Sequence, residues 1–207
     1  MRFRLTSLFS LGLLLSVLLS SAHAEGDATR GKTLAYTCHG CHGIPNYKNA
    51  APTYSVPKLG GQQAGYMIAA LKEYASGDRA HPTMHAHAAS NSEQDREDMA
   101  AFFAGEGARK GTVVGTPPTV AQVCTACHGS DGRPVTPEYP NLSGQHADYL
   151  AQALRDYKSG KRKNAIMAGI VSSLADKDIE AISAFYAKQP GLCDTKQILD
   201  NKGKCVK

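Results

Sequence analysis

The sequence predicts an all-α fold made of two similar halves, and three observations support this. Aromatic and apolar residues recur at four-residue spacing, as in Tyr66, Ala70 and Tyr74, which places them on one face of a helix. No segment shows the alternating pattern of a strand. Residues 57–84 also align without a gap with residues 140–167, and thirteen of the 28 positions are identical. We therefore expect a duplicated helical domain.

Each half is predicted to contain three helices. The expected ranges are 27–38, 62–76 and 93–104 in the first half, and 118–124, 145–159 and 176–187 in the second. Gly77 and Gly160 directly follow the middle helices, where a left-handed residue commonly ends a helix. Pro118 suits the start of its helix because its missing N–H would have no partner there. Ser92 and Asp95 form a start that resembles a capping box.

The domain boundaries follow from composition. Residues 1–24 have the basic start, the leucine-rich apolar stretch and the small-x-small site of a cleaved secretory signal peptide. The apolar stretch is shorter than the roughly 20 residues that span a bilayer. We expect domains over 25–107 and 118–190, a Gly- and Pro-rich linker over 108–117 and a C-terminal extension over 191–207. The mature chain is expected in a bacterial periplasm.

Each half contains one C-x-x-C-H motif. Two thiols one helical turn apart can add to the vinyl groups on one edge of a heme, and the adjacent histidine then lies under the iron. Two covalently bound heme c groups are therefore predicted. The expected attachment residues are Cys38 and Cys41 for heme one and Cys124 and Cys127 for heme two, and the expected axial histidines are His42 and His128.

A C-x-x-C pair can also hold zinc or act as a redox dithiol. A zinc site made from these four cysteines would not require a histidine directly after each second cysteine. A dithiol of the thioredoxin type would lie in a βαβ pattern, and none is visible. Heme attachment is therefore favoured. Short helices with long connections form a poor core alone, so we expect the apoprotein to be largely unfolded.

The repeat also selects a second axial ligand for each iron. A thioether opposite the histidine is common in c-type electron carriers and raises the reduction potential. Met167 is the single methionine of the second half, and Met84 is its counterpart in the alignment. Met67 and Met99 fall within predicted helices and are expected in the core. Met84 and Met167 are therefore the predicted sulfur ligands.

Three histidines surround Met84 and offer alternative ligands for the first iron: His81, His85 and His87. The second half has Asn164, Ala168 and Ile170 at the matching positions, so the histidines are not part of the shared pattern. We expect these three histidines either to be surface residues or to form a pH-sensitive rim around heme one. With both axial positions filled, each iron can change its charge by one electron with little movement of its ligands.

These motifs, each present twice, resemble the diheme cytochrome c-four family of class I cytochromes c: Cys-x-x-Cys-His-Gly, Pro-x-Leu-x-Gly-Gln, Tyr-x-x-x-x-Leu-x-x-Tyr-x-x-Gly and a late methionine. The resemblance extends to about Gln189. It implies two tandem class I cytochrome c domains, with two His/Met hemes that face each other across the domain interface. It also implies a periplasmic or membrane-surface carrier between a quinol-oxidising complex and a terminal oxidase or other periplasmic reductase.

We therefore expect an electron carrier and not an enzyme. One alternative is a cytochrome subunit of a periplasmic dehydrogenase complex that oxidises sulfide or alcohol. Another is a diheme peroxidase, which would need an open axial position. Nucleic-acid binding is not expected for an exported heme protein with a formal net charge of only +5.

Charge differs between the two halves. From Glu25 to the residue before Gly107, 7 basic and 9 acidic residues give −2, and after Gly107, 14 basic and 9 acidic residues give +5. Such a dipole could orient docking to different partners. Lys158, Lys161, Arg162 and Lys163 form a basic cluster that is expected either to rim heme two or to be a solvated helix end.

Cys193 and Cys205 lie outside the heme motifs and enclose a short polar tail. In an oxidising compartment a disulfide between them is the simplest expectation. Free or intermolecular thiols are the alternative. The expected role of the disulfide is to pin the C-terminus.

Overall fold

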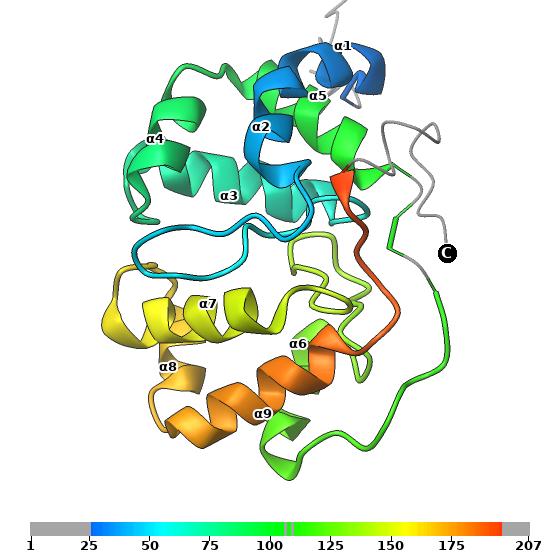
Figure 1. The fold of residues 1–207 in the computed structure, drawn as a ribbon, viewed down its shortest axis with the longest axis vertical. Coiled ribbons are helices and arrows are strands. Elements are labelled where there is room, and N and C mark those ends of the chain that lie inside the picture. The colour runs from blue at the N-terminus through cyan, green and yellow to red at the C-terminus, as the bar shows by residue number, and fades with distance from the viewer. Residues whose placement is uncertain (1–25, 106, 109, 196–207) are drawn as a thin grey trace, which may run out of the picture.

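The structure is a computed structural model that describes residues 26–105, 107–108 and 110–195. Within these ranges the chain is helical and forms two lobes that lie one above the other in Figure 1. The first lobe contains α1 (Ala28–Leu34), η1 (Ala35–Cys38), α2 (His39–His42), α3 (Ala64–Ser76), α4 (Pro82–Ala89) and α5 (Glu93–Ala104). The second lobe contains η2 (Thr119–Ala121), α6 (Gln122–His128), α7 (Ala147–Ser159), α8 (Ala165–Val171) and α9 (Asp176–Ala187). No helix in the described part of the chain is long and apolar enough to cross a membrane.

The predicted middle and last helices are confirmed in both lobes. The last helices have the expected ends, and α3 and α7 each begin two residues later than expected. Gly77 and Gly160 end α3 and α7 with φ angles of 84° and 77°, in the left-handed region. The capping box of Ser92 and Asp95 is also present. Met67 and Met99 are buried in the first-lobe core, as expected.

Two helices were not predicted from the sequence. They are α4 and α8, which carry Met84 and Met167. Each is short and buries a single residue, Ala88 in α4 and Val171 in α8, so neither has the apolar stripe that reveals a helix.

Helix α1 packs across α5 through contacts with Asp98. The Asp98 carboxylate accepts hydrogen bonds from the Asp27 backbone N–H at 2.8 Å and from Gln94 Nε2 at 2.9 Å. It also forms an ion pair with Arg30. Gly31 lies so close to α5 that a Cβ atom there would be 1.9 Å from the Asp98 carbonyl oxygen. A larger residue at this crossing would therefore force the two helices apart.

Asp98 should make the first lobe sensitive to acid. Hydrogen bonds from Gln94 and Arg30 hold the pKa of Asp98 below its ordinary value. A lowered folded-state pKa contributes stability above the unfolded value of about 3.9, and that stability is lost as the pH falls through the folded value. We expect Asp98→Asn to lower the melting temperature at neutral pH and to reduce the loss of stability below about pH 4. Melting curves across pH test this, with exposed Asp176→Asn as the control. Parallel pH profiles for wild type and Asp98→Asn would contradict it.

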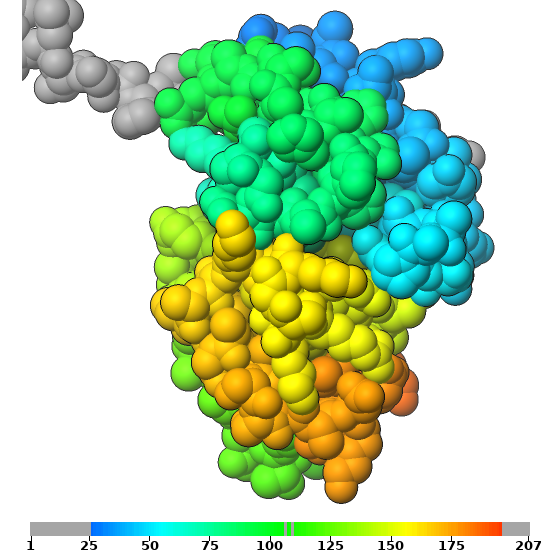
Figure 2. All heavy atoms as spheres, turned by 90° about the vertical axis from the view of Figure 1, so that its left-hand side faces the viewer, coloured from blue at the N-terminus to red at the C-terminus, as the bar shows by residue number. Residues whose placement is uncertain are grey.

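The two lobes meet through hydrogen bonds made by equivalent residues of the repeat. The Gln62 side chain donates to the Asn141 carbonyl oxygen at 3.1 Å and accepts from the Asn141 N–H at 2.7 Å. The Gln145 side chain makes the same pair of bonds with the Lys58 backbone, both at 3.0 Å. Both glutamines are buried. The interface therefore has approximate two-fold symmetry, and Figure 2 shows the lobes in direct contact along it.

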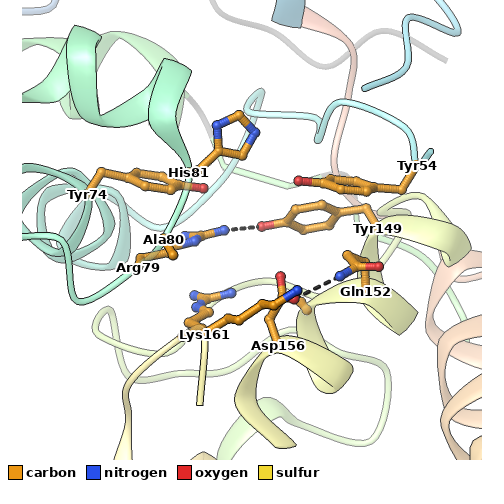
Figure 3. Close-up of a pocket in the computed structure, with 11 residues that line it drawn as sticks. Tyr54, Tyr74, Arg79, Ala80, His81, Tyr149, Gln152, Asp156 and Lys161 are labelled. Atoms are coloured by element: carbon orange, nitrogen blue, oxygen red, sulfur yellow. Dashed lines mark hydrogen bonds between the residues drawn. The ribbon is translucent and has the colours of Figure 1, made fainter. Parts of the chain in front are cut away.

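Two buried arginines lie at the centre of this interface. Arg79 Nη2 donates to the Tyr149 hydroxyl at 2.6 Å (Figure 3), and Arg162 Nη2 donates to the Tyr66 hydroxyl at 2.8 Å. Each guanidinium also lies over a tyrosine ring of its own lobe, 4.4 Å from the centroid of Tyr74 or Tyr157. Burial alone would raise the pKa of Tyr66, but Arg162 and Arg79 together lower it to about 8. The two arginines therefore place two buried positive charges at the interface.

One of the two interpretations of the basic cluster is wrong for Arg162. Its side chain is 5% exposed and faces the first lobe, so it is not part of a solvated helix end, and its place at the rim of heme two stays a prediction. Lys163 pairs with Asp78 of the first lobe at 3.1 Å, and its backbone N–H donates to the Asp78 carbonyl oxygen at 2.8 Å. These two residues of the cluster hold the lobes together.

Candidate heme-binding sites

The two C-x-x-C-H motifs lie in different lobes. The first spans the end of η1 and helix α2, and the second lies within α6. The four motif cysteines form no disulfide and have intermediate exposure: Cys38, Cys41, Cys124 and Cys127. Because the two pairs lie in different lobes, the structure does not favour a single zinc site made from all four.

The motif histidines have the same orientation in both lobes. His42 Nδ1 lies 2.8 Å from the Pro57 carbonyl oxygen, and His128 Nδ1 lies 3.3 Å from the Pro140 carbonyl oxygen. A carbonyl can only accept, so Nδ1 carries the proton and Nε2 keeps its lone pair. This is the usual arrangement for a histidine that binds a metal through Nε2.

Burial keeps both histidines neutral. It lowers the pKa of His42 to about 4, with smaller contributions from nearby positive charges that include Arg79, and the Pro57 carbonyl opposes the shift. Burial also lowers the pKa of His128, against the opposing effect of the Pro140 carbonyl. Neutral imidazole is the form that binds iron.

The two predicted methionines lie at equivalent places. Met84 and Met167 are each the third residue of a short helix, α4 or α8, and each is partly buried. The Met84 N–H donates to His81 Nδ1 at 3.3 Å, and the Met167 N–H donates to Asn164 Oδ1 at 3.0 Å. His81 and Asn164 are therefore matching N-cap residues. Pro82 at the first helical position and Asn164 as a cap are the sequence signals that could have revealed these helices.

The other histidines near Met84 have other contacts. His81 Nε2 lies 3.4 Å from Asn49 Oδ1, so both of its ring nitrogens face protein partners. His85 Nδ1 donates to the Tyr74 carbonyl oxygen at 2.8 Å. His87 is exposed.

The donor set of each lobe fits a heme c. It supplies two thiols, a neutral imidazole with a free Nε2 and a thioether on a capped helix. Among the described residues, no group of three or more His, Cys, Asp or Glu side chains is placed to hold a metal ion by itself.

Comparison with known proteins decides the family. The cytochrome c family profile matches residues 28–105 and 118–189. Cytochrome c4 of Pseudomonas aeruginosa is 35% identical over 198 residues, which cover 84% of this chain and 96% of that protein. The chain belongs to the cytochrome c4 family. It is an electron-transfer cytochrome with two covalently bound heme c groups, and not an enzyme.

This cytochrome is also similar to a solved structure and to a second named protein. A solved structure described as reduced recombinant cytochrome c4 from Pseudomonas stutzeri matches with a TM-score of 0.62 and 30% identity, over 79% of this chain and 99% of that one. A protein of Stutzerimonas stutzeri named thiosulfate dehydrogenase electron acceptor is 30% identical, over 84% of this chain and 90% of its own length. The cytochrome therefore exchanges electrons with other redox proteins.

Two predictions concern residues beyond those that the structure describes. The signal peptide over 1–24 and the disulfide partner Cys205 both lie there. Cys193 itself is buried and packs in the core of the first lobe.

Proposed function

We propose that His42 and Met84 are the axial ligands of heme one, and that His128 and Met167 are those of heme two. Cys38, Cys41, Cys124 and Cys127 would form the thioether bonds. The observation that carries this proposal is the repetition of one arrangement in both lobes. A histidine held through Nδ1 by a proline carbonyl is combined with a methionine at the third position of a capped helix.

The bound hemes supply a one-electron couple at each site. The residues of this chain keep both axial positions filled, so that electron transfer needs little movement of ligands. The two buried guanidinium groups at the interface would suit the carboxylate groups of the two hemes. The guanidinium groups of Arg79 and Arg162 donate to phenols and are buried, and a buried positive charge requires a compensating anion. The heme propionates would supply it.

We further propose that the cytochrome is a mobile periplasmic carrier that also associates loosely with the membrane surface. Its partners would be a quinol-oxidising complex as donor and a terminal oxidase or other periplasmic reductase as acceptor. The formal charges of −2 and +5 on the two halves of the mature chain would direct different partners to different lobes. The alternative is a relay in a periplasmic dehydrogenase complex, which the thiosulfate dehydrogenase electron acceptor favours.

Isolation of the holoprotein from its native periplasm separates these two functions. A mobile carrier is expected to elute as a lone chain at both low and high salt. A relay would elute together with a dehydrogenase activity that persists at high salt, and this result would contradict the carrier proposal.

A disulfide between Cys193 and Cys205 is proposed to pin the C-terminus in either case.

A further inference from the structure

The chain returns from the second lobe to the first after α9. Residues 189–195, called the C-terminal strap below, rise from the end of α9 along both lobes and end beside α2 (Figure 1). The strap lies outside the aligned repeat of residues 57–84 and 140–167. The repeat therefore predicts no equivalent segment that would contact the C-x-x-C-H motif of the second lobe.

The strap is held tightly against the second lobe. The Leu192 N–H donates to the Ser143 carbonyl oxygen at 2.8 Å, and Leu192 is completely buried. A Cβ atom at Gly191 would lie 2.0 Å from the same oxygen, so only glycine allows this approach. Gln189 is also buried, and its side chain exchanges two hydrogen bonds of 2.9 Å with the Val114 backbone.

The strap then enters the first lobe. The Cys193 N–H donates to the Gly60 carbonyl oxygen at 2.9 Å, and the Cys193 side chain packs in the core of that lobe. Thr195 is completely buried, and its hydroxyl donates a hydrogen bond to the His42 carbonyl oxygen. The backbone of His42 is thus bonded by the strap, while its ring is held by Pro57.

We propose that Thr195 is a positioning residue for the heme-one histidine, and that the strap sets the reduction potential of heme one relative to heme two. The proposal rests on His42 as the axial ligand of heme one. Thr195 fixes the backbone of the ligand and excludes water from its carbonyl. Water admitted at this point would raise the local dielectric and favour the oxidised heme, which carries the additional positive charge.

Thr195→Val tests the role of the hydroxyl in the full-length holoprotein, because it removes the hydrogen bond and nearly preserves the volume. A spectroscopic redox titration resolved by heme is expected to show a lower potential for heme one and an unchanged potential for heme two. Thr195→Ser keeps the hydroxyl and should restore the wild-type value. Gly191→Ala, which disturbs the strap where it leaves the second lobe, should shift heme one in the same direction.

Thr53→Val is the matched control. The Thr53 hydroxyl also donates to a carbonyl of the first lobe, that of Ala50 at 3.1 Å, but on an exposed loop. Neither potential should change in this variant. An unchanged heme-one potential in Thr195→Val, or an equal shift of both hemes, would overturn the proposal. Failure of the His42 assignment is distinguishable, because wild-type heme one would then lack the spectrum of a histidine-ligated iron.

Discussion

Replacement of Met167 by leucine is expected to lower the reduction potential of heme two by on the order of 0.1 V, a fraction of the roughly 0.8 V range that axial ligands cover. The thioether stabilises the reduced iron, and leucine preserves the apolar volume without offering a ligand. The absorption band of the ferric iron–methionine bond should disappear for heme two only. Met84→Leu should do the same to heme one. A potentiometric titration followed by absorption spectroscopy measures both effects.

Met67→Leu is the matched control for this prediction. Met67 is buried in the first-lobe core, and a volume-conserving exchange there should cost less than about 1.5 kcal/mol of stability. Neither heme should change its potential or lose its iron–methionine band. Retention of that band by heme two in Met167→Leu would show that another residue binds the iron.

Simultaneous replacement of Gln62 and Gln145 by leucine is expected to separate the two lobes. Each glutamine satisfies a backbone N–H and a carbonyl oxygen of the opposite lobe, so four backbone groups, buried at Asn141 and partly buried at Lys58, lose a partner. Each unsatisfied group costs about 1–3 kcal/mol while the lobes stay in contact, and water satisfies it again once they part, so the exchange favours separation. Small-angle X-ray scattering should show a larger radius of gyration, and electron exchange between the hemes should slow.

Gln189→Leu provides a control with the same chemistry. Gln189 is equally buried and also exchanges two hydrogen bonds with a backbone segment, but that segment is the linker at Val114 and not the opposite lobe. This variant should lose stability while the lobes stay together. If the double variant keeps the wild-type radius and exchange rate, the glutamine pairs do not hold the interface.

The sequence predicted the parts of the fold that depend on local pattern. Helices α3 and α7 have a regular apolar face and a glycine at the end, and both were located within two residues. Helices α4 and α8 were missed because each buries only one residue, although the alignment placed their methionines at equivalent positions. The repeat thus identified the proposed ligands, but it did not predict the helices that carry them.

The contacts between the two lobes could not be predicted from the local sequence pattern. Arg162 lies between lysines in the sequence, and nothing local distinguishes a buried guanidinium from a solvated one. Its burial depends on Tyr66, which is 96 residues away. The contact between Thr195 and His42 spans 153 residues and has no counterpart in the repeat. Long-range polar contacts of this kind become visible only when the lobes are placed together.

We expect the two hemes, each closed by histidine and methionine, to form an electron relay in one chain. A spectroscopic redox titration of the holoprotein, resolved by heme, tests this relay. Two one-electron transitions are expected, and each oxidised heme should show the iron–methionine band. A heme that lacks this band, or that has an open high-spin iron able to bind peroxide, would contradict the account.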